Sequence, residues 1–347
     1  MVGPLFWQLA LRVDPYGRRL PELYKALEAA ELFDPLGALR THPKLTERDR
    51  ALLAKTDSRK LEQVLHQGAW CRSCLDLNLP WREWGIPPAF FGRGAIPQSD
   101  QPRVSIVGTR TASTYGKAAA LKFGQHLAAA GVQVVSGGAF GIDANAHRGA
   151  LDAGGTTMAI LGTGIENLQP AANSSLFQEI IAKGTILSQY AVGSPGKGDA
   201  FIARNHTIAA MSHAVVVIEA PEKSGALHTA RAAAELGREV FVVPGPISLE
   251  NFRGSHALIR DGATLVDHPS QILEQLGIQD IGGGFISTEE VSEIGGQITE
   301  VLKDGPQMVE VLAETLGLDA GEIMAELTML EVEGLVVRVP EGYALQQ

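Results

Sequence analysis

The sequence has little cysteine, few aromatic residues and no long apolar run. Of its 347 residues, two are cysteines, Cys71 and Cys74, and aromatic residues make up 6%. One C-x-x-C pair cannot complete a four-ligand zinc site, and it lacks the strand-then-helix context of a redox motif, so we predict two plain buried or half-buried thiols. No apolar run approaches the roughly 18 residues of a membrane span, and the N-terminus shows no secretory signal. We therefore expect a cytoplasmic protein with no membrane contact.

Basic charge is nearly absent from the last fifth of the chain. The net charge of −10 combines 14 Lys and Arg against 12 Asp and Glu in residues 1–100, 13 against 14 in residues 101–280, and 2 against 13 in residues 281–347. The acidic excess is therefore confined to the C-terminal part. The central region is close enough to neutral for a local basic pocket to set its own field.

No catalytic or metal-binding arrangement has a recognisable spacing. Ser136, Ser188, Ser224 and Glu219 do not combine into a nucleophile, a base and an orienting acid, so we predict no enzyme activity and no cofactor. Asp143 and His147, four residues apart on one helical face, have no further ligand nearby. Helix capping by the carboxylate and a hydrogen-bonded histidine are favoured there over a metal site.

Short β-branched or fully apolar runs alternate with helical segments through the centre of the chain. The strand-like runs span residues 104–107, 132–135, 157–161, 185–189, 214–218, 240–243 and 264–266. The helical segments include residues 115–130, 174–183, 203–211, 225–236 (with Ser224 as the expected cap) and 269–276. Apolar strands alternating with helices predict an α/β fold with an extended Rossmann-like parallel sheet at residues 99–280.

Glycine-rich turns follow the strands of this sheet. They contain Gly108, Gly137, Gly138, Gly141, Gly162 and Gly164. Ligands of such folds lie beyond the carboxyl ends of the strands, where helix N-termini offer N–H groups to anions. Arg110 adds a fixed positive charge there, although neither turn matches a dinucleotide fingerprint.

Two smaller parts flank the sheet. Residues 1–98 are predicted as a helical domain, with helices at 20–31, 46–53 and 58–67 and a Pro-rich connector in which Phe90 and Phe91 pack rather than stack on bases.

Residues 281–296 are predicted as a Gly-rich linker. Residues 297–347 have the outline of a winged helix, with helices at 297–303, 308–316 and 320–333 and strands at 335–339 and 343–345. Its third helix is acidic, so contact with protein is favoured over groove binding.

Eight sequence blocks resemble the DprA/Smf family of DNA-processing proteins, in family order. They are V-S-I-V-G-T-R-x-x-S-x-Y-G from Val104, S-G-G-A-F-G-I-D-A-x-A-H-x-G-A-L from Ser136, A-I-L-G-T-G from Ala159, F-x-x-R-N-x-x-I-A-x-x-S from Phe201, V-V-V-I-E-A from Val215, S-G-A-L-x-T-A from Ser224, G-R-x-V-F-V-V-P-G from Gly237 and L-I-x-D-G-A from Leu258. The resemblance covers nearly the whole central domain.

The resemblance implies a non-enzymatic protein that binds single-stranded DNA. It implies protection of incoming DNA and loading of the RecA recombinase in natural transformation and recombination, with a homodimer formed through the Rossmann-like domain. Single strands need phosphate contacts and a flat group for a base, and Phe140 could supply that face. The DNA-binding residues expected from the resemblance and the turns are Gly108, Thr109, Arg110, Ser136, Gly137, Gly138, Phe140, Gly141, Arg148, Lys183, Arg204, Asn205 and His206.

Two departures from the family pattern reduce the positive charge. The family usually has R-N-R where this chain has Arg204, Asn205 and His206, and a Tyr-Pro pair often followed by Lys where it reads Leu168-Gln169-Pro170-Ala171. Arg148 and Lys183 are therefore the expected replacement cations.

Two other functions stay open at this point. A Rossmann-type phosphoribohydrolase would carry a P-G-G-x-G-T-x-x-E block, but this chain has P-G-P-I-S from Pro244, which removes the catalytic acid. A protein-binding adaptor is the second alternative.

Overall fold

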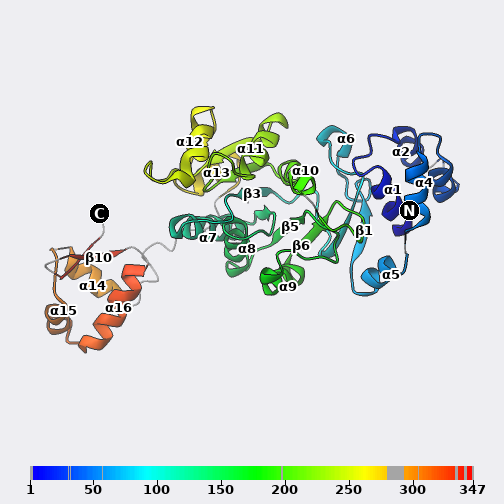
Figure 1. The fold of residues 1–347 in the computed structure, drawn as a ribbon. Coiled ribbons are helices and arrows are strands. Elements are labelled where there is room, and N and C mark those ends of the chain that lie inside the picture. The colour runs from blue at the N-terminus through cyan, green and yellow to red at the C-terminus, as the bar shows by residue number, and fades with distance from the viewer. Residues whose placement is uncertain are drawn as a thin grey trace. The chain divides into compact units, whose positions relative to one another are not determined.

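The computed structural model describes residues 3–29, 31, 33–56, 58–196, 198–279, 293–303, 305–332, 335–339 and 342–345 (Figure 1). The chain divides into two compact units, residues 1–283 and 284–347. Among the residues that the structure describes, no helix is both long and apolar enough to cross a membrane.

A nine-stranded sheet forms the centre of the first unit. Its strands stand in the order β1-β2-β6-β5-β4-β3-β7-β8-β9. Their bounds are β1 Trp70–Ser73, β2 Ala89–Gly94, β3 Arg103–Val107, β4 Gln133–Ser136, β5 Thr157–Leu161, β6 Thr185–Ser188, β7 Ala214–Val217, β8 Glu239–Val242 and β9 Thr264–Leu265. The seven predicted strands are confirmed and pair in parallel from β6 to β9. The strand order reverses at β3, which lies between β4 and β7, so the ligand crevice of such a fold is expected beyond these strands.

Helices cover both faces of the sheet. Their bounds are α7 Thr114–Ala129, α8 Ile142–Asp152, α9 Ser174–Lys183, α10 Gly198–Ala210, α11 Ala226–Glu235, α12 Arg253–Arg260 and α13 Ser270–Gln275, with short 3₁₀ turns at Ala171–Asn173 and Glu250–Phe252. Helices α7, α8 and α9 lie side by side on one face, and α10 and α11 lie on the other (Figure 1). Right-handed crossovers produce this division, because the chain moves along the sheet in opposite directions before and after β6.

The two edge strands β1 and β2 are not in the predicted set. Strand β2 lies inside the stretch predicted as a Pro-rich connector, and it pairs antiparallel with both β1 and β6. Phe90 and Phe91 of β2 are fully buried, so the packing prediction for them is confirmed. Cys71 and Cys74 are buried free thiols whose pKa values are raised by burial, as predicted for plain thiols.

In the described part of residues 1–100, six helices precede the parallel strands. They are α1 Pro4–Val13, α2 Pro21–Glu28, α3 Pro35–Thr41, α4 Glu47–Ala54, α5 Ser58–His66 and α6 Trp81–Trp84. The predicted helices correspond to α2, α4 and α5, whereas α1, α3 and α6 were missed. Gln8 of α1 exchanges two hydrogen bonds of 2.9 and 2.8 Å with the backbone of Val192. The helical part is thereby attached to the loop that follows β6.

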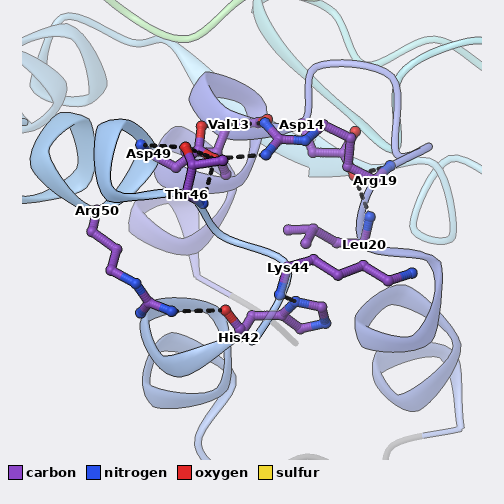
Figure 2. Close-up of polar contacts among 9 residues, drawn as sticks. All are labelled: Val13, Asp14, Arg19, Leu20, His42, Lys44, Thr46, Asp49 and Arg50. Carbon is purple, nitrogen blue, oxygen red and sulfur yellow. Dashed lines mark hydrogen bonds and ion pairs between the residues drawn. The ribbon is translucent and has the colours of Figure 1, made fainter.

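A polar cluster joins the first turns of this helical part (Figure 2). The carboxylate of Asp14 accepts hydrogen bonds from the backbone N–H groups of Arg18, Arg19 and Leu20 at 2.9 to 3.0 Å. The Arg19 guanidinium donates to both carboxylate oxygens of Asp49, at 3.2 and 2.6 Å. Thr46 and Asp49 form a reciprocal capping box at the start of α4, which satisfies N–H groups that the helix leaves unpaired.

The second unit is a winged helix with its own core. It contains α14 Glu293–Leu302, α15 Val309–Leu316, α16 Ala320–Val332, β10 Val336–Val339 and β11 Gly342–Leu345. A separate buried cluster includes Ile298, Leu312 and Leu327. The predicted linker at 281–296 falls mostly on residues 280–292, which lie outside the described residues. Helix α14 already includes residues 293–296, so the linker prediction was too long at its C-terminal end.

Candidate functional site

The turn after β3 presents Arg110 at the carboxyl edge of the sheet. The N–H of Thr109 donates to the Glu219 carbonyl at 2.7 Å, and the Thr109 carbonyl accepts from Ile142 N–H at 3.2 Å. A Cβ on Gly108 would lie 2.4 Å from Ile142, so the turn requires glycine here. Arg110 itself is exposed, and its guanidinium lies 5.7 Å from the ring centre of Phe201. The turn is fixed while its cation stays accessible.

The loop after β4 is shaped by a buried carboxylate. Asp143 Oδ2 accepts hydrogen bonds from the N–H groups of Gly137 at 3.1 Å and Ala139 at 3.3 Å. Burial raises the pKa of Asp143, while the charge of Arg204 lowers it. Phe140, in the same loop, is 46% exposed. Asp143 thus has a structural role, but the prediction that it caps the helix was wrong: Gly141 is the N-cap of α8, which has no side-chain cap hydrogen bond, and Asp143 instead holds the preceding loop. The same loop holds an aromatic ring toward solvent.

Two glycines of this loop adopt left-handed backbone. Gly138 has φ +70° and Gly141 has φ +74°. A Cβ on Gly141 would lie 2.4 Å from the Thr109 carbonyl oxygen and 2.7 Å from that of Arg110. The glycine loop and the arginine turn therefore touch through backbone, which only glycine permits.

Arg204 of α10 lies beneath the loop and is 5% exposed. Its Nη1 donates to the Gly137 carbonyl at 2.7 Å and to the Ile160 carbonyl. Burial lowers the pKa of Arg204, Asp143 raises it, and Arg110 lowers it. The buried guanidinium joins the ends of β4 and β5 and adds positive potential below the site.

Two cavities lie at this edge, with Arg110, Ala139 and Arg204 lining both. The larger, of about 290 Å³, extends between the turn after β3 and the start of α11. Its further lining residues are Val107, Gly108, Thr109, Asp143, Asn205, Ile208, Pro221, Lys223, Ser224, Gly225, Ala226 and Thr229. The smaller, of about 150 Å³, is further lined by Gly137, Phe140, Gly162, Gln169, Pro170 and Phe201. The sheet therefore places a polar cavity beside an aromatic one.

Three predicted DNA-binding residues, two of them cations, line neither of these two cavities. Arg148 forms an ion pair of 2.7 Å with Glu179 of α9. Lys183 is exposed at the C-terminal end of α9. His206 Nε2 lies 2.8 Å from the Trp84 carbonyl oxygen, because its side of α10 faces the helical part. The spacing along α10 places Arg204 at the site and turns His206 away from it.

Other predicted residues support the site from below. Ser136 is fully buried and donates to the Ile106 carbonyl at 2.6 Å. Gly138 and Gly141 shape the loop without lining either cavity. Asn205 lines the larger cavity and donates to the Gly225 carbonyl at 3.1 Å.

The structure adds residues that the sequence interpretation missed. Phe201 is the ring beside Arg110, and Lys223 supplies a cation at the start of α11. Both adjoin or belong to blocks already recognised in the sequence, but those blocks do not indicate which side chain faces the site. Helix α11 begins at Ala226 with Gly225 as its N-cap, not Ser224; Ser224 Oγ accepts from the Ala226 N–H at 3.3 Å.

The acid and metal candidates are structural. The Glu219 carboxylate accepts hydrogen bonds of 2.6 Å from Ser113 Oγ and from Asn251 Nδ2. His147 Nδ1 lies 2.7 Å from Thr157 Oγ1, and burial lowers the pKa of His147 to about 3. In the described part of the chain, no group of three or more His, Cys, Asp or Glu residues could hold a metal ion.

Comparison with known proteins identifies the family. The family model of DNA recombination-mediator protein A matches residues 78–277, and that of the DprA winged helix domain matches residues 287–342. The chain belongs to the DprA/Smf family of DNA-processing proteins. The resemblance of the eight sequence blocks is thereby confirmed.

Several DprA/Smf relatives match most of this chain. The putative DNA processing protein DprA of Mycobacterium tuberculosis is 37% identical over 275 residues, which cover 77% of this chain and 69% of the relative. Protein Smf of Escherichia coli is 35% identical over 266 residues, covering 74% and 71%. The structure of DprA from Streptococcus pneumoniae has a TM-score of 0.68 at 30% identity and covers 79% of this chain and 99% of that one.

A second DprA structure is described by its DNA-binding mode. DNA processing protein A from Helicobacter pylori matches with a TM-score of 0.51 and 30% identity, covering 55% of this chain and 87% of that one. It is described as having a unique single-stranded DNA binding mode.

Proposed function

We propose that this chain binds single-stranded DNA at the two cavities beyond β3, β4 and α11. The observation that carries the proposal is the pairing of Arg110 with exposed aromatic surface. Arg110 is exposed 5.7 Å from the Phe201 ring, and Phe140 lines the same 150 Å³ cavity. Single-strand sites combine cations for phosphates with aromatic rings on which bases stack. A base paired within a duplex cannot enter such a cavity without unstacking.

The family supports the same conclusion. A relative of known structure is described as a single-stranded DNA binder. The carboxyl edge of β3 and β4 is also where the sheet reverses its strand order, which is the usual ligand position in this class of fold.

The proposal extends to the wider role that the resemblance to the family implies. The protein would shield incoming DNA and load the RecA recombinase onto it during natural transformation and homologous recombination, without catalysing a reaction. Among the described residues that line the two cavities, the one carboxylate is Asp143, which is occupied by backbone N–H groups. This arrangement favours binding over a phosphoribohydrolase activity.

A homodimer through the Rossmann-like domain belongs to the same proposal. Strand β9 ends the sheet, consists of two exposed residues and presents Leu265 at 48% exposure. An open edge with an apolar side chain is a surface on which a second copy can pack.

The test is a fluorescence anisotropy titration with one oligonucleotide sequence, single-stranded and annealed to its complement. We expect tighter binding of the single strand, with a shallow salt dependence because few cations line the site. Each cation that neutralises a phosphate contributes about −0.7 to the slope of log binding constant against log salt concentration. Three lining cations therefore correspond to a slope near −2. Equal affinity for both forms would contradict the cavity site, and no affinity for either would favour the protein-binding adaptor.

A further inference from the structure

The larger cavity contains a buried hydroxyl that no protein group uses. Thr229 of α11 is 1% exposed and lines this cavity. Its hydroxyl forms no hydrogen bond with any residue that the structure describes. Because Thr229 lines the cavity, its hydroxyl is available to a ligand or to water there.

The N-terminus of α11 lies at the same cavity. The helix begins at Ala226 and is ten residues long, and the lining includes Lys223, Ser224, Gly225 and Ala226. Lys223 is exposed, and the positive end of the helix dipole adds to its charge. An anion is the ligand that matches a helix N-terminus, a lysine and a hydroxyl donor together.

The negative charge in this cavity is compensated. Asp143 lines the wall, but its Oδ2 accepts two backbone N–H groups. Arg204 and Asp143 both approach Gly137, where a Cβ would lie 2.6 Å from Arg204 Nη1 and 2.7 Å from Asp143 Oδ2. The remaining charge of the wall comes from Arg110 and Lys223, so the cavity favours an anion.

We propose that the larger cavity is a phosphate subsite, in which Thr229 Oγ1, Lys223 and the N-terminus of α11 bind a phosphate group of the strand. This inference rests on the proposed function. The adjoining cavity has the aromatic side chains, so the base lies there and the phosphate enters the cavity without an aromatic lining. Arg110 lines both cavities and binds the connecting backbone.

The test compares Thr229→Val, Thr229→Ser and Lys223→Gln in the full-length protein. Valine keeps the shape and removes the hydroxyl, whereas serine keeps it. We expect Thr229→Val to weaken binding of an oligo-dT strand about tenfold and Thr229→Ser to stay within about twofold. Lys223→Gln should weaken binding and reduce the salt slope by about 0.7. The matched control is Arg231→Gln, an exposed cation further along α11 that lines neither cavity, which should leave affinity and slope unchanged.

Two oligonucleotides, with a 5′-phosphate or a 5′-hydroxyl, distinguish the source of the phosphate. A 5′-phosphate advantage that disappears in Thr229→Val assigns the subsite to strand ends. If the wild-type protein binds both oligonucleotides equally and Thr229→Val loses the same affinity for each, the subsite is assigned to internal phosphates.

The phosphate subsite and the proposed function fail differently. If Thr229→Val and Lys223→Gln bind like Arg231→Gln while Arg110→Ala loses affinity, the subsite is wrong and the proposed function stands. If the wild-type protein binds no single strand, the proposed function is wrong and the subsite falls with it.

Discussion

At the scale of single residues, the two arginines of the site differ in their surroundings. Arg204 is buried and donates to the carbonyls of Gly137 and Ile160, so its donors support the loop. Arg110 is exposed and contacts the face of Phe201. Removing Arg204 would leave buried carbonyls unpaired and disturb the fold, whereas Arg110 can be removed with little effect on stability.

Arg110→Ala is therefore expected to weaken single-strand binding by about 1.5–3 kcal/mol, roughly 10- to 150-fold, because charged hydrogen bonds to phosphate are lost. Anisotropy titration measures the loss, and a thermal melt within about 2 °C of wild type confirms folding. Wild-type affinity in the folded variant would disprove the assignment of Arg110 to the DNA site.

At the scale of elements, the site depends on backbone contact between two loops. Gly141 approaches the carbonyl oxygens of Thr109 and Arg110 with φ +74°. Gly131 has a similar φ of +80°, but a Cβ there would meet nothing within 4 Å. Gly131→Ala is therefore a control for a positive φ alone, whereas Gly141 adds its ψ of −121° and the contact with the Arg110 turn.

Gly141→Ala should destabilise the first unit by about 1–3 kcal/mol more than Gly131→Ala and should also weaken DNA binding, because the Arg110 turn must move. Thermal unfolding and the titration above measure both effects. Equal effects of the two substitutions on stability and affinity would mean that the loop contact does not position Arg110.

The stability that the cap of α4 contributes depends on pH. The Arg19 guanidinium lowers the pKa of Asp49 below its usual range, with further lowering by Thr46 against an opposing effect of burial. A carboxylate with a lowered folded pKa stabilises the protein above its unfolded pKa of about 3.9 and loses that effect as the pH falls toward the folded value.

Asp49→Asn is therefore expected to lower the free energy of unfolding by about 1–2 kcal/mol at pH 7, with the gap to wild type closing below about pH 4. All four tryptophans lie in residues 1–100, so tryptophan fluorescence in urea reports on this part. Glu47→Gln, at an exposed neighbouring carboxylate, is the control. If the difference in the free energy of unfolding between wild type and Asp49→Asn stayed constant down to pH 2, the ion pair would not contribute to stability.

At the scale of the whole molecule, charge is distributed unevenly between the units. Residues 281–347 contain 13 acidic and 2 basic residues, whereas the rest of the chain is almost neutral. The first unit, residues 1–283, has its own cores, and the winged helix has another. The acidic unit would repel phosphates within about 10 Å at 0.1 M salt.

Deleting the residues after Gly284 should leave single-strand affinity equal or slightly higher at low salt, and the difference should shrink as salt rises. The first unit is expected to stay folded because its cores are separate. Anisotropy titration at two salt concentrations measures the change, with circular dichroism and light scattering as controls. A truncated protein that is folded and dimeric but has lost most of its affinity would show that the winged helix contributes to DNA binding.

The sequence by itself determined the parallel strands, the winged helix and the turn that carries Arg110. These features are local: apolar runs specify buried strands, and Gly108 specifies the turn that follows β3. It did not identify β2, because a strand that completes a sheet edge depends on its partner β6 more than on its own composition.

Only the tertiary structure decided which side chains reach the site. His206 and Arg204 lie two residues apart on α10, yet one contacts Trp84 and the other lines both cavities. Thr229 and Phe201 carry no local signal of their own, because a side chain becomes a ligand contact when distant elements enclose a cavity around it. The direction of each helix face and the meeting of strand ends are properties of packing, so they were decided by the fold as a whole.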